Sequence, residues 1–221
     1  MPDLTGGSKE LPGYGVAAVI LLVLYAIQAE IRFGERARSR QAGASDRNST
    51  RALSVCAVVP VIGFVLAMKA NSPSFSFVPG WFRGAVLPGG PVIEWVGIVL
   101  GGSGIVLRLW AVLTLRERYS RTLLIQQEHS IERGGPYRWV RHPGYLGSLL
   151  VFNGFALASG NWIVLFASLA ATLSAYAYRI RVEDEMLVAA LGDPYAQYRR
   201  EVGALVPSLR ATTVGKSPSK A

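Results

Sequence analysis

The sequence contains a single cysteine, Cys56, and only two histidines, His129 and His142. One cysteine excludes an internal disulfide, a CxxC redox pair and a cysteine-rich zinc site, and two histidines leave few ligands for another transition metal. Charged residues are also scarce, at 17% of the 221 residues against 51% hydrophobic residues. This balance excludes a disordered chain and is unlike a typical water-soluble domain, so we expect one compact unit built largely from apolar segments.

Familiar cofactor and catalytic motifs are missing as well. The sequence has no GxGxxG motif after a strand, no phosphate-binding P-loop, no GxSxG nucleophile elbow and no HExxH metal motif. It also lacks the alternating pattern of strands, which excludes the soluble nucleotide-binding folds. Any cofactor must therefore be held by helices and by the loops between them.

Long uncharged runs predict helices that cross a membrane. With their flanking residues, 13–27, 52–67 and 92–107 approach the ~20 residues that cross a ~30 Å hydrocarbon core, and we predict them as the first three spans. A cleaved signal peptide is the alternative for residues 13–27. The preceding residues include Asp3 and Glu10 where a signal peptide has a basic segment, so the span is favoured.

Two further spans are predicted from the chain between residues 143 and 178, which contains no charged residue. As one straight helix these 36 residues would be roughly 54 Å long, nearly twice the thickness of the membrane core. We therefore expect the chain to fold back at residues 159–161 (Ser-Gly-Asn), giving two short antiparallel spans over residues 145–158 and 162–178.

The predicted fold class is therefore all-α. We expect one membrane-embedded domain over residues 1–221, with about five transmembrane helices, a C-terminal cytosolic amphipathic helix and a disordered tail over residues 210–221. Gly97 and Gly101 have the GxxxG spacing that allows helices to approach closely, and we expect this pair to pack inside the chain rather than to form a dimer.

Basic residues predict the side of the membrane on which each loop lies, because they are enriched on the cytosolic side. Residues 32–51, 108–141 and 179–220 contain six, seven and seven lysines and arginines, whereas the N-terminus and the loop after the second span contain three together. We therefore expect the N-terminus outside, the C-terminus in the cytosol and the loop 71–90 outside as an interfacial cover. The net charge of +9 then belongs at the membrane surface, and no nucleic-acid partner is expected.

Residues 126–147 form the first of two segments that are dense in specific side chains. A turn at residues 134–136 (Gly-Gly-Pro) leads to the start of the fourth span, where His142 precedes Pro143. The free backbone donors of such a helix start favour an anion, which predicts a ligand site. The alternative is an aromatic and basic belt that only anchors the chain at the membrane interface.

Residues 179–202 form the second segment and continue out of the fifth span. Their apolar residues recur at helical spacing, which predicts an amphipathic helix interrupted at residues 192–194 (Gly-Asp-Pro). Arg179 and Glu183 are four residues apart and therefore share one face of this helix. The alternative is a solvated helix with an ordinary surface ion pair. The neighbouring carboxylates do not have the spacing of a calcium loop, so no metal site is expected.

The sequences GGPYRWVRHPGYLG at residues 134–147 and RIRVEDEMLVAALGDPYAQYRREV at residues 179–202 resemble the paired signature of the isoprenylcysteine carboxyl methyltransferase family of integral-membrane methyltransferases. The resemblance covers about residues 118–207, which we take as the cofactor-binding part, and the first three spans resemble the family only in number and hydrophobicity. It implies an S-adenosyl-L-methionine pocket that faces the cytosol, roofed by the C-terminal helices, with a lipid-accessible opening for a prenyl chain.

The resemblance also assigns roles to individual residues. Arg179 matches the position that meets the substrate carboxylate. The sequence departs from the family pattern at Glu132, where the family usually has an apolar residue, and at Asp184, which replaces the second of two glutamates. The positions that match cofactor contacts are Gln126, His129, Ser130, Ile131, Glu132, Tyr137, His142, Pro143, Gly144, Tyr145 and Glu183.

What the resemblance implies is methyl transfer to the carboxylate of a prenyl-like or lipid substrate in the bilayer. A carboxylate is already ionised at pH 7 and needs no general base, so we interpret His142 as a donor in the cofactor pocket. The alternatives are a phospholipid N-methyltransferase-like enzyme, a sterol-reductase-like enzyme that uses NADPH, and a non-enzymatic membrane scaffold. The short chain and its GPYxxxRHPxYxG pattern favour methyl transfer.

Overall fold

The computed structural model describes residues 20, 25, 49–70, 73–115 and 131–208. Within these residues every regular element is a helix, and pairing of extended segments is limited to two isolated bridges. The predicted first span and the predicted C-terminal tail lie outside the described residues, apart from Ile20 and Tyr25. The elements are α3 (Ser49–Lys69), η1 (Pro73–Phe75), α4 (Gly80–Arg83), α5 (Pro91–Leu115), η3 (Gly135–Arg138), α6 (Pro143–Ala158), α7 (Trp162–Leu191) and α8 (Asp193–Glu201).

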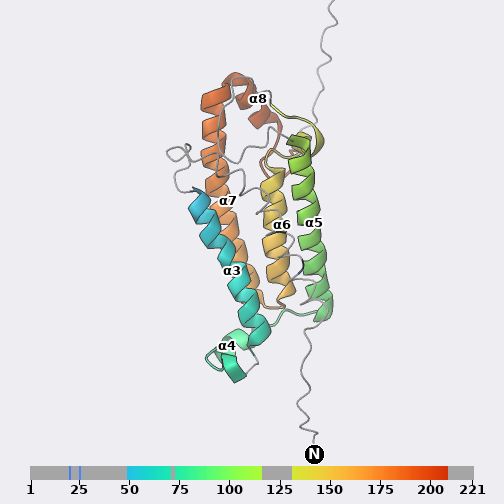
Figure 1. Ribbon diagram of the computed structural model, residues 1–221, viewed down its shortest axis with the longest axis vertical. Coiled ribbons are helices and arrows are strands. Elements are labelled where there is room, and N and C mark those ends of the chain that lie inside the picture. The colour runs from blue at the N-terminus through green and yellow to red at the C-terminus, as the bar shows by residue number, and fades with distance from the viewer. Residues whose placement is uncertain (1–19, 21–24, 26–48, 71–72, 116–130, 209–221) are drawn as a thin grey trace, which may run out of the picture.

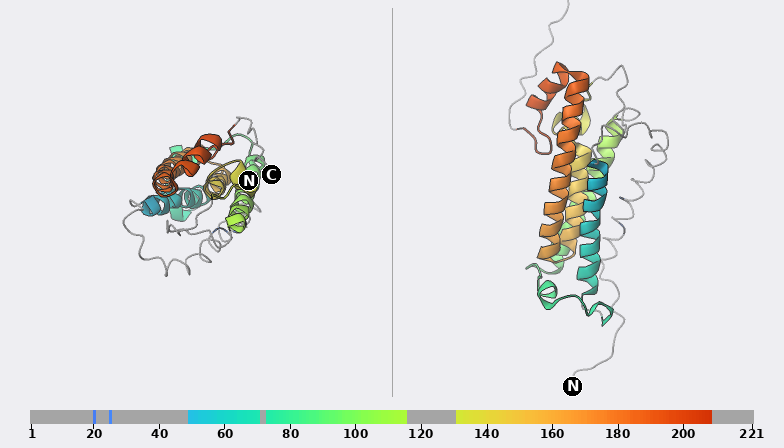
Figure 2. Two further views of the ribbon diagram at one scale, coloured as in Figure 1. Left: turned by 90° about the horizontal axis from the view of Figure 1, so that it is seen from above. Right: turned by 90° about the vertical axis from the view of Figure 1, so that its left-hand side faces the viewer.

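Four long helices, α3, α5, α6 and α7, lie side by side along the long axis of the molecule (Figure 1). α6 contacts each of the other three, and α3 also packs against α7. The right-hand view in Figure 2 shows α4 at one end of this bundle and α8 at the other. α5 and α7 are long and apolar enough to cross a membrane, and Val55–Lys69 and α6 are shorter apolar helices.

The helices contain the predicted apolar runs, but α5 extends further than expected. α5 continues eight residues past the predicted end at residue 107, because Arg108 does not begin a solvated loop. Its side chain is only 6% exposed, and Nη1 donates to the carbonyl oxygen of Gly144 (3.2 Å) and to the hydroxyl of Ser148 on α6. The placement of Arg108 in a basic loop is therefore wrong. α7 runs unbroken from Trp162 to Leu191, so the chain stays helical past residue 178 up to the predicted interruption at residues 192–194.

Glycines let α5 and α6 approach until their backbones touch. A Cβ atom added to Gly97 would lie 2.5 Å from the carbonyl oxygen of Gly154, and one added to Gly154 would lie 2.5 Å from the amide nitrogen of Gly101. Gly104 and Gly147 make the corresponding contact nearer the other end of the two helices. The prediction that Gly97 and Gly101 pack inside the chain is confirmed, since no larger residue fits between these backbones.

The predicted turn between the last two long helices is also confirmed. α6 ends at Ala158 and α7 begins at Trp162. Gly160 has a φ of +65°, a conformation that favours glycine, and the Asn161 side chain caps α7 by accepting from the amides of Ile163 (3.0 Å) and Val164 (3.2 Å).

The segment around α4 covers this turn. Asn161 donates from Nδ2 to the carbonyl oxygen of Phe82 (2.9 Å), and the Trp162 amide donates to the carbonyl oxygen of Ala85 (3.0 Å). The Leu87 amide donates in turn to the carbonyl oxygen of Gly160 (2.8 Å). The described part of residues 71–90 therefore packs over the turn between α6 and α7, and its predicted place outside the membrane stays a prediction.

Candidate active site

The two segments that the sequence singled out meet at the end of the bundle that carries α8 (Figure 1). The loop before α6 pairs with the chain after α8: the Arg141 amide donates to the carbonyl oxygen of Gly203 (2.8 Å), and the His142 amide donates to that of Ala204 (3.1 Å). These bonds hold the start of α6 against the chain after α8. Side-chain bonds from Arg141 and His142 to Asp184 on α7 bring together residues about 40 positions apart in the sequence.

A first group of side chains joins Tyr145 on α6 to Arg179 and Glu183 on α7. The Tyr145 hydroxyl donates to Oε2 of Glu183 and accepts from Nε of Arg179 (3.1 Å). The same Arg179 nitrogen is 3.8 Å from Glu183 Oε2, which confirms that the two residues share one helix face. The Arg179 side chain is 8% exposed and that of Glu183 22%, so this group is largely buried and differs from an ordinary surface pair.

A second group surrounds Asp184, which is 2% exposed. Its Oδ1 lies 3.1 Å from Nε2 of His142 and accepts from the hydroxyl of Tyr195 (2.6 Å), and its Oδ2 accepts from Nη2 of Arg141 (2.8 Å). Asp184 lies beyond the uncharged stretch that ends at residue 178. Burial opposes its ionisation, but the hydrogen bonds from His142 and Tyr195 and the adjacent Arg141 outweigh burial and hold the pKa of Asp184 well below its usual range.

The two groups touch through an aromatic contact. The rings of His142 and Tyr145 stack with their centroids 5.3 Å apart and an angle of 8° between their planes. A line of contacts therefore runs from Asp184 through His142 and Tyr145 to Glu183 and Arg179. In the described residues, no group of three or more histidine, cysteine, aspartate or glutamate side chains has an arrangement that could hold a metal ion.

Other predicted site residues have different positions. Ile131 packs against the cluster formed by Tyr195, Tyr198 and Val202. The Glu132 carboxylate accepts from the amide of Gly134 (2.7 Å), so part of it is engaged within its own loop.

Tyr137 is buried between two helices. Its hydroxyl reaches toward the carbonyl oxygen of Ala111 on α5 (3.4 Å), and its own carbonyl oxygen accepts from the hydroxyl of Tyr198 on α8 (2.6 Å). Its hydroxyl therefore does not join the Tyr145 or Asp184 groups. Burial raises the pKa of Tyr198 to about 12, which keeps this hydroxyl a donor at neutral pH.

Pro143 and Gly144 open α6 and are both buried. The carbonyl oxygen of Gly144 accepts from Arg108 (3.2 Å) and from the Ser148 hydroxyl (3.0 Å), so its backbone ties α6 to α5. The predicted contacts Gln126, His129 and Ser130 lie outside the described residues.

Several residues at this end were missed by the sequence reasoning, namely Arg108, Arg141, Asp184 and Tyr195. Arg108 carried a usable signal, because a charged residue that continues an apolar helix is commonly functional or paired. In the sequence, Asp184 stands out only as a departure from the family pattern. Nothing in the sequence separates it from the exposed Glu185, which forms a surface pair with Arg181 (3.0 Å).

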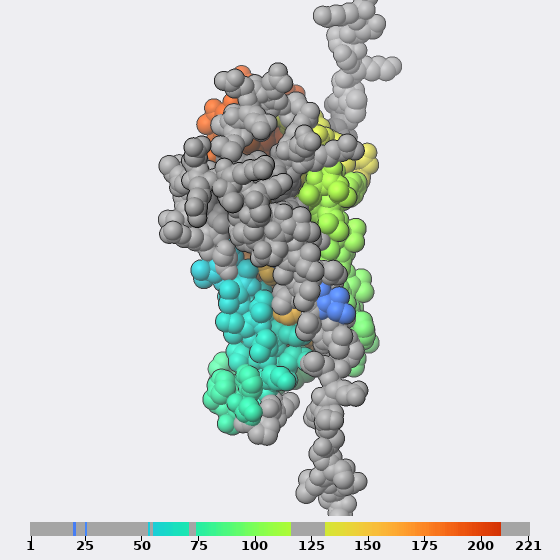
Figure 3. Space-filling view, viewed as in Figure 1, coloured from blue at the N-terminus to red at the C-terminus, as the bar shows by residue number. Residues whose placement is uncertain are grey.

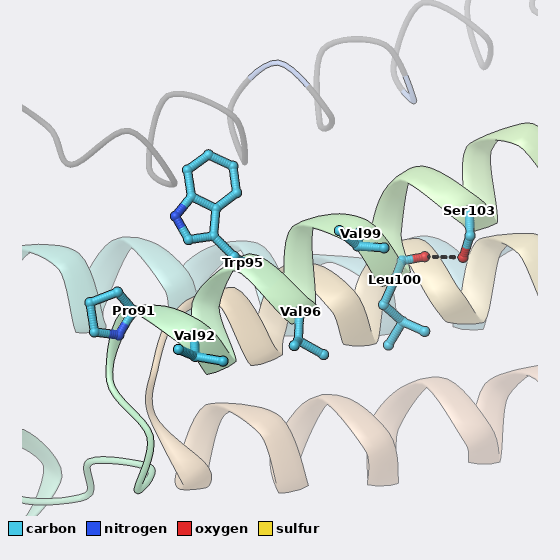
Figure 4. Close-up of a pocket in the computed structure, with 7 residues that line it drawn as sticks. All are labelled: Pro91, Val92, Trp95, Val96, Val99, Leu100 and Ser103. Atoms are coloured by element: carbon cyan, nitrogen blue, oxygen red, sulfur yellow. Dashed lines mark hydrogen bonds between the residues drawn. The ribbon is translucent and has the colours of Figure 1, made fainter.

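A groove of about 560 Å³ lies elsewhere, along α5, and its described lining residues all belong to that helix (Figure 4). Its lining is almost entirely apolar and includes Trp95, Val96 and Val99, with Ser103 at one end. Figure 3 shows that α3 and α5 both reach the surface of the molecule. None of the described residues that line the groove is ionisable, and none belongs to the groups around Tyr145 and Asp184.

Known proteins resemble the chain most clearly around this site. The sequence model of the isoprenylcysteine carboxyl methyltransferase (ICMT) family matches residues 95–189. The protein-S-isoprenylcysteine O-methyltransferase of Tribolium castaneum is 29% identical over 137 residues, which are 60% of this chain and 49% of that protein. The methanethiol S-methyltransferase of Pseudomonas sp. (strain GM41(2012)) is 29% identical over 178 residues, or 74% of this chain and 61% of that protein.

A solved structure has the same fold. The structure of the eukaryotic intramembrane Ras methyltransferase ICMT superposes with a TM-score of 0.60 at 22% identity, covering 88% of this chain and 65% of that one. The chain spans about half the length of the isoprenylcysteine methyltransferases it matches. The matched residues 95–189 include Arg108, the start of α6 and the charged part of α7. These comparisons confirm the resemblance to the isoprenylcysteine carboxyl methyltransferase family over residues 95–189, and the solved structure shows the same fold.

Proposed function

We propose that the chain is an S-adenosyl-L-methionine-dependent methyltransferase of the membrane that methylates the carboxylate of a prenyl-like or lipid substrate. The observation that carries the proposal is the buried group of Arg179, Tyr145 and Glu183 where the apolar part of α7 ends. A lipid-borne acid that moves along this helix meets a guanidinium there. The relatives named as methyltransferases support the same reaction class.

The chemistry of these side chains suits the cofactor. S-adenosyl-L-methionine has an ammonium group and ribose hydroxyls that need acceptors, and Glu183 offers a carboxylate that is partly exposed. Tyr145 and His142 add a hydroxyl, a ring nitrogen and aromatic faces beside it. When bound, this cofactor supplies a methyl group on a positively charged sulfur. We assign Glu183, Tyr145 and His142 to hold it. Gln126, His129 and Ser130, which lie outside the described residues, remain predicted contacts.

Arg179 is the residue that we assign to the substrate. Its planar guanidinium can hold a carboxylate through two hydrogen bonds, which fixes both the position and the direction of the attacking oxygen. Oε2 of Glu183 lies 3.8 Å from Nε of Arg179. This carboxylate partly compensates the positive charge of Arg179 while no substrate is bound. Because an ionised carboxylate needs no general base, the residues contribute by orienting the reactants and excluding water.

Methylation of a thiol is a second candidate. The Pseudomonas methanethiol S-methyltransferase matches 74% of this chain, a larger share than the Tribolium enzyme does. The Arg179–Glu183 pair is close to neutral overall, so a small thiol also fits beside it. The two candidates differ in one respect that can be measured, since only the carboxylate substrate requires the arginine.

A direct experiment separates these possibilities. The detergent-purified protein is titrated calorimetrically with S-adenosylhomocysteine and with NADPH, and transfer of a labelled methyl group is then measured with an S-farnesylcysteine derivative and with methanethiol. We expect binding of S-adenosylhomocysteine alone and transfer to the farnesylcysteine carboxylate. Transfer only to methanethiol would favour the second candidate, and binding of neither ligand would leave a membrane scaffold.

We further propose that five spans place the α8 end in the cytosol and the α6–α7 turn outside. The chain offers a simple test because Cys56 is its only cysteine. In a Cys56→Ala background, Ser159→Cys and Gln197→Cys should react with a membrane-impermeant maleimide from opposite sides of oriented vesicles. Labelling of both from the same side would contradict this topology.

A further inference from the structure

Asp184 has no role in the reaction proposed above, although it lies at the centre of four side chains. Arg141 and His142 approach from the loop before α6, and Tyr195 and Arg199 approach from α8. Burying a carboxylate costs free energy unless it is paired with a cation and its oxygens are hydrogen-bonded. Both oxygens of Asp184 have such partners.

The bonds of Asp184 determine where the proton of His142 must be. An ionised carboxylate has only acceptor sites, and the low pKa of Asp184 keeps it ionised. The imidazole nitrogen that lies 3.1 Å from Oδ1 is Nε2, so Nε2 must be the donor. In a neutral imidazole the other nitrogen, Nδ1, then carries a lone pair and can only accept.

The ring that carries this lone pair is also fixed in orientation. The stacking contact with Tyr145 sets its plane, and Tyr145 is itself bonded to Glu183 and Arg179. Among the described residues, the side-chain hydrogen bond of His142 is the one that joins Nε2 to Asp184, and it leaves Nδ1 for a ligand. The acceptor therefore lies beside the group that we assign to cofactor and substrate.

We propose that Asp184 is a positioning residue that fixes the orientation and the tautomer of the His142 ring, with the proton on Nε2, so that Nδ1 presents an acceptor to an N–H donor of the cofactor. The identity of the ligand rests on the function proposed above, whereas the tautomer does not. His142 is then an acceptor in the pocket, and not the donor expected from the sequence.

The tautomer is measured by nitrogen-15 NMR of the ring nitrogens in the full chain at pH 8. The chain has only two histidines, so the signals of His142 are those absent from a His142→Ala variant. We expect Nε2 to be protonated and Nδ1 to be unprotonated in the unmodified protein and in Glu185→Gln. A ring protonated on Nδ1, alone or together with Nε2, would overturn the proposal whatever the enzyme does.

A second measurement tests the consequence for binding. Asp184→Asn should weaken S-adenosylhomocysteine binding roughly 10- to 100-fold, because the fixed acceptor loses its orientation. Asp184→Glu keeps the carboxylate and should recover affinity to within about threefold of the unmodified protein. Glu185→Gln, which changes the exposed neighbour, is the matched control and should bind normally.

The outcomes separate positioning from mere folding. Equal losses in Asp184→Asn and Asp184→Glu, or normal binding by Asp184→Asn, would overturn the role of the carboxylate. Should Asp184→Asn not fold, Tyr195→Phe removes only one bond to Oδ1 and leaves the ion pair with Arg141 intact. It is then expected to shift the His142 signals, and unchanged signals would contradict the proposal. Failure of the unmodified protein to bind S-adenosylhomocysteine would instead reject the proposed function.

Discussion

The two ends of the helical bundle are joined by different kinds of interaction. At the α6–α7 turn, Asn161 and backbone amides bond to carbonyl oxygens of the segment around α4, and every one of these groups is neutral. At the α8 end, the helices are joined by buried charged side chains, among them Arg179 and Asp184. Both ends connect the same two long helices to a neighbouring loop.

This difference indicates what the charged end is for. At the turn, neutral hydrogen bonds join the segment around α4 to α6 and α7, and each contributes about 1 kcal/mol. Buried ions stabilise a fold far less efficiently than neutral hydrogen bonds do, because the desolvation of each ion costs several kcal/mol before pairing offsets it. The ionised groups at the α8 end therefore exceed what the fold requires, which is why we assign the chemistry to that end.

The largest expected effect is the loss of Arg179. Arg179→Ala should lower methyl transfer to a prenylcysteine substrate about 100-fold or more, because the cation that orients the carboxylate is gone, while S-adenosylhomocysteine binding is retained. Arg179→Lys should recover only part of the rate, since a point charge cannot reproduce two parallel hydrogen bonds.

The control for this change lies two residues further along α7. Arg181 is exposed and pairs with Glu185 on the same helix, so Arg181→Ala should leave turnover unchanged. Normal turnover in Arg179→Ala, or an equal loss in both variants, would show that the buried arginine is no more than a structural charge.

The next largest effect concerns Glu183. Glu183→Ala should weaken S-adenosylhomocysteine binding roughly 10- to 100-fold in a calorimetric titration, because the partly exposed acceptor assigned to a charged ligand is removed. Glu185→Ala is the matched control and should bind as the unmodified protein does. If Glu183→Ala binds normally but loses turnover, the carboxylate acts on Arg179 and not on the cofactor.

A smaller effect should distinguish Tyr145 on α6 from Tyr137 on η3. Tyr145→Phe removes a hydroxyl bonded to Glu183 and Arg179, and it should weaken cofactor binding about 2- to 10-fold. Tyr137→Phe removes a hydroxyl that faces Ala111 on α5 at 3.4 Å and should change binding by less than about twofold. The reverse order of effects would mean that Tyr137 lines the pocket as the sequence suggested.

Much of the helical arrangement could be predicted because apolar run length and turn residues act locally. The fold-back at residues 159–161 and the packing of Gly97 and Gly101 followed from length and spacing alone. The end of α5 did not, since the burial of Arg108 depends on Ser148 and Gly144 of another helix. A pattern within one helix does not predict a hydrogen-bond partner on another helix.

The candidate site divides in the same way. The shared face of Arg179 and Glu183 is a property of one helix and was predicted correctly. The bond between His142 and Asp184 joins residues 42 positions apart, and it depends on how the loop before α6 packs against α8. The sequence therefore identified the right segments but could not rank Asp184 above Glu185.

The smallest effect is expected at the α6–α7 turn, where Asn161 and backbone groups make the contacts. Asn161→Ala removes the cap of α7 and the bond to Phe82, so it should lower the free energy of unfolding by roughly 1 kcal/mol. Turnover per folded molecule should not change, because no charged group moves. Asn161→Asp keeps the oxygen that caps α7 but cannot donate to Phe82, so it should retain part of the lost stability. Thermal unfolding in detergent, measured beside methyl transfer, checks both expectations. A loss of turnover in folded Asn161→Ala would mean that the two ends are coupled through α7, and the assignment of chemistry to one end would then have to be revised.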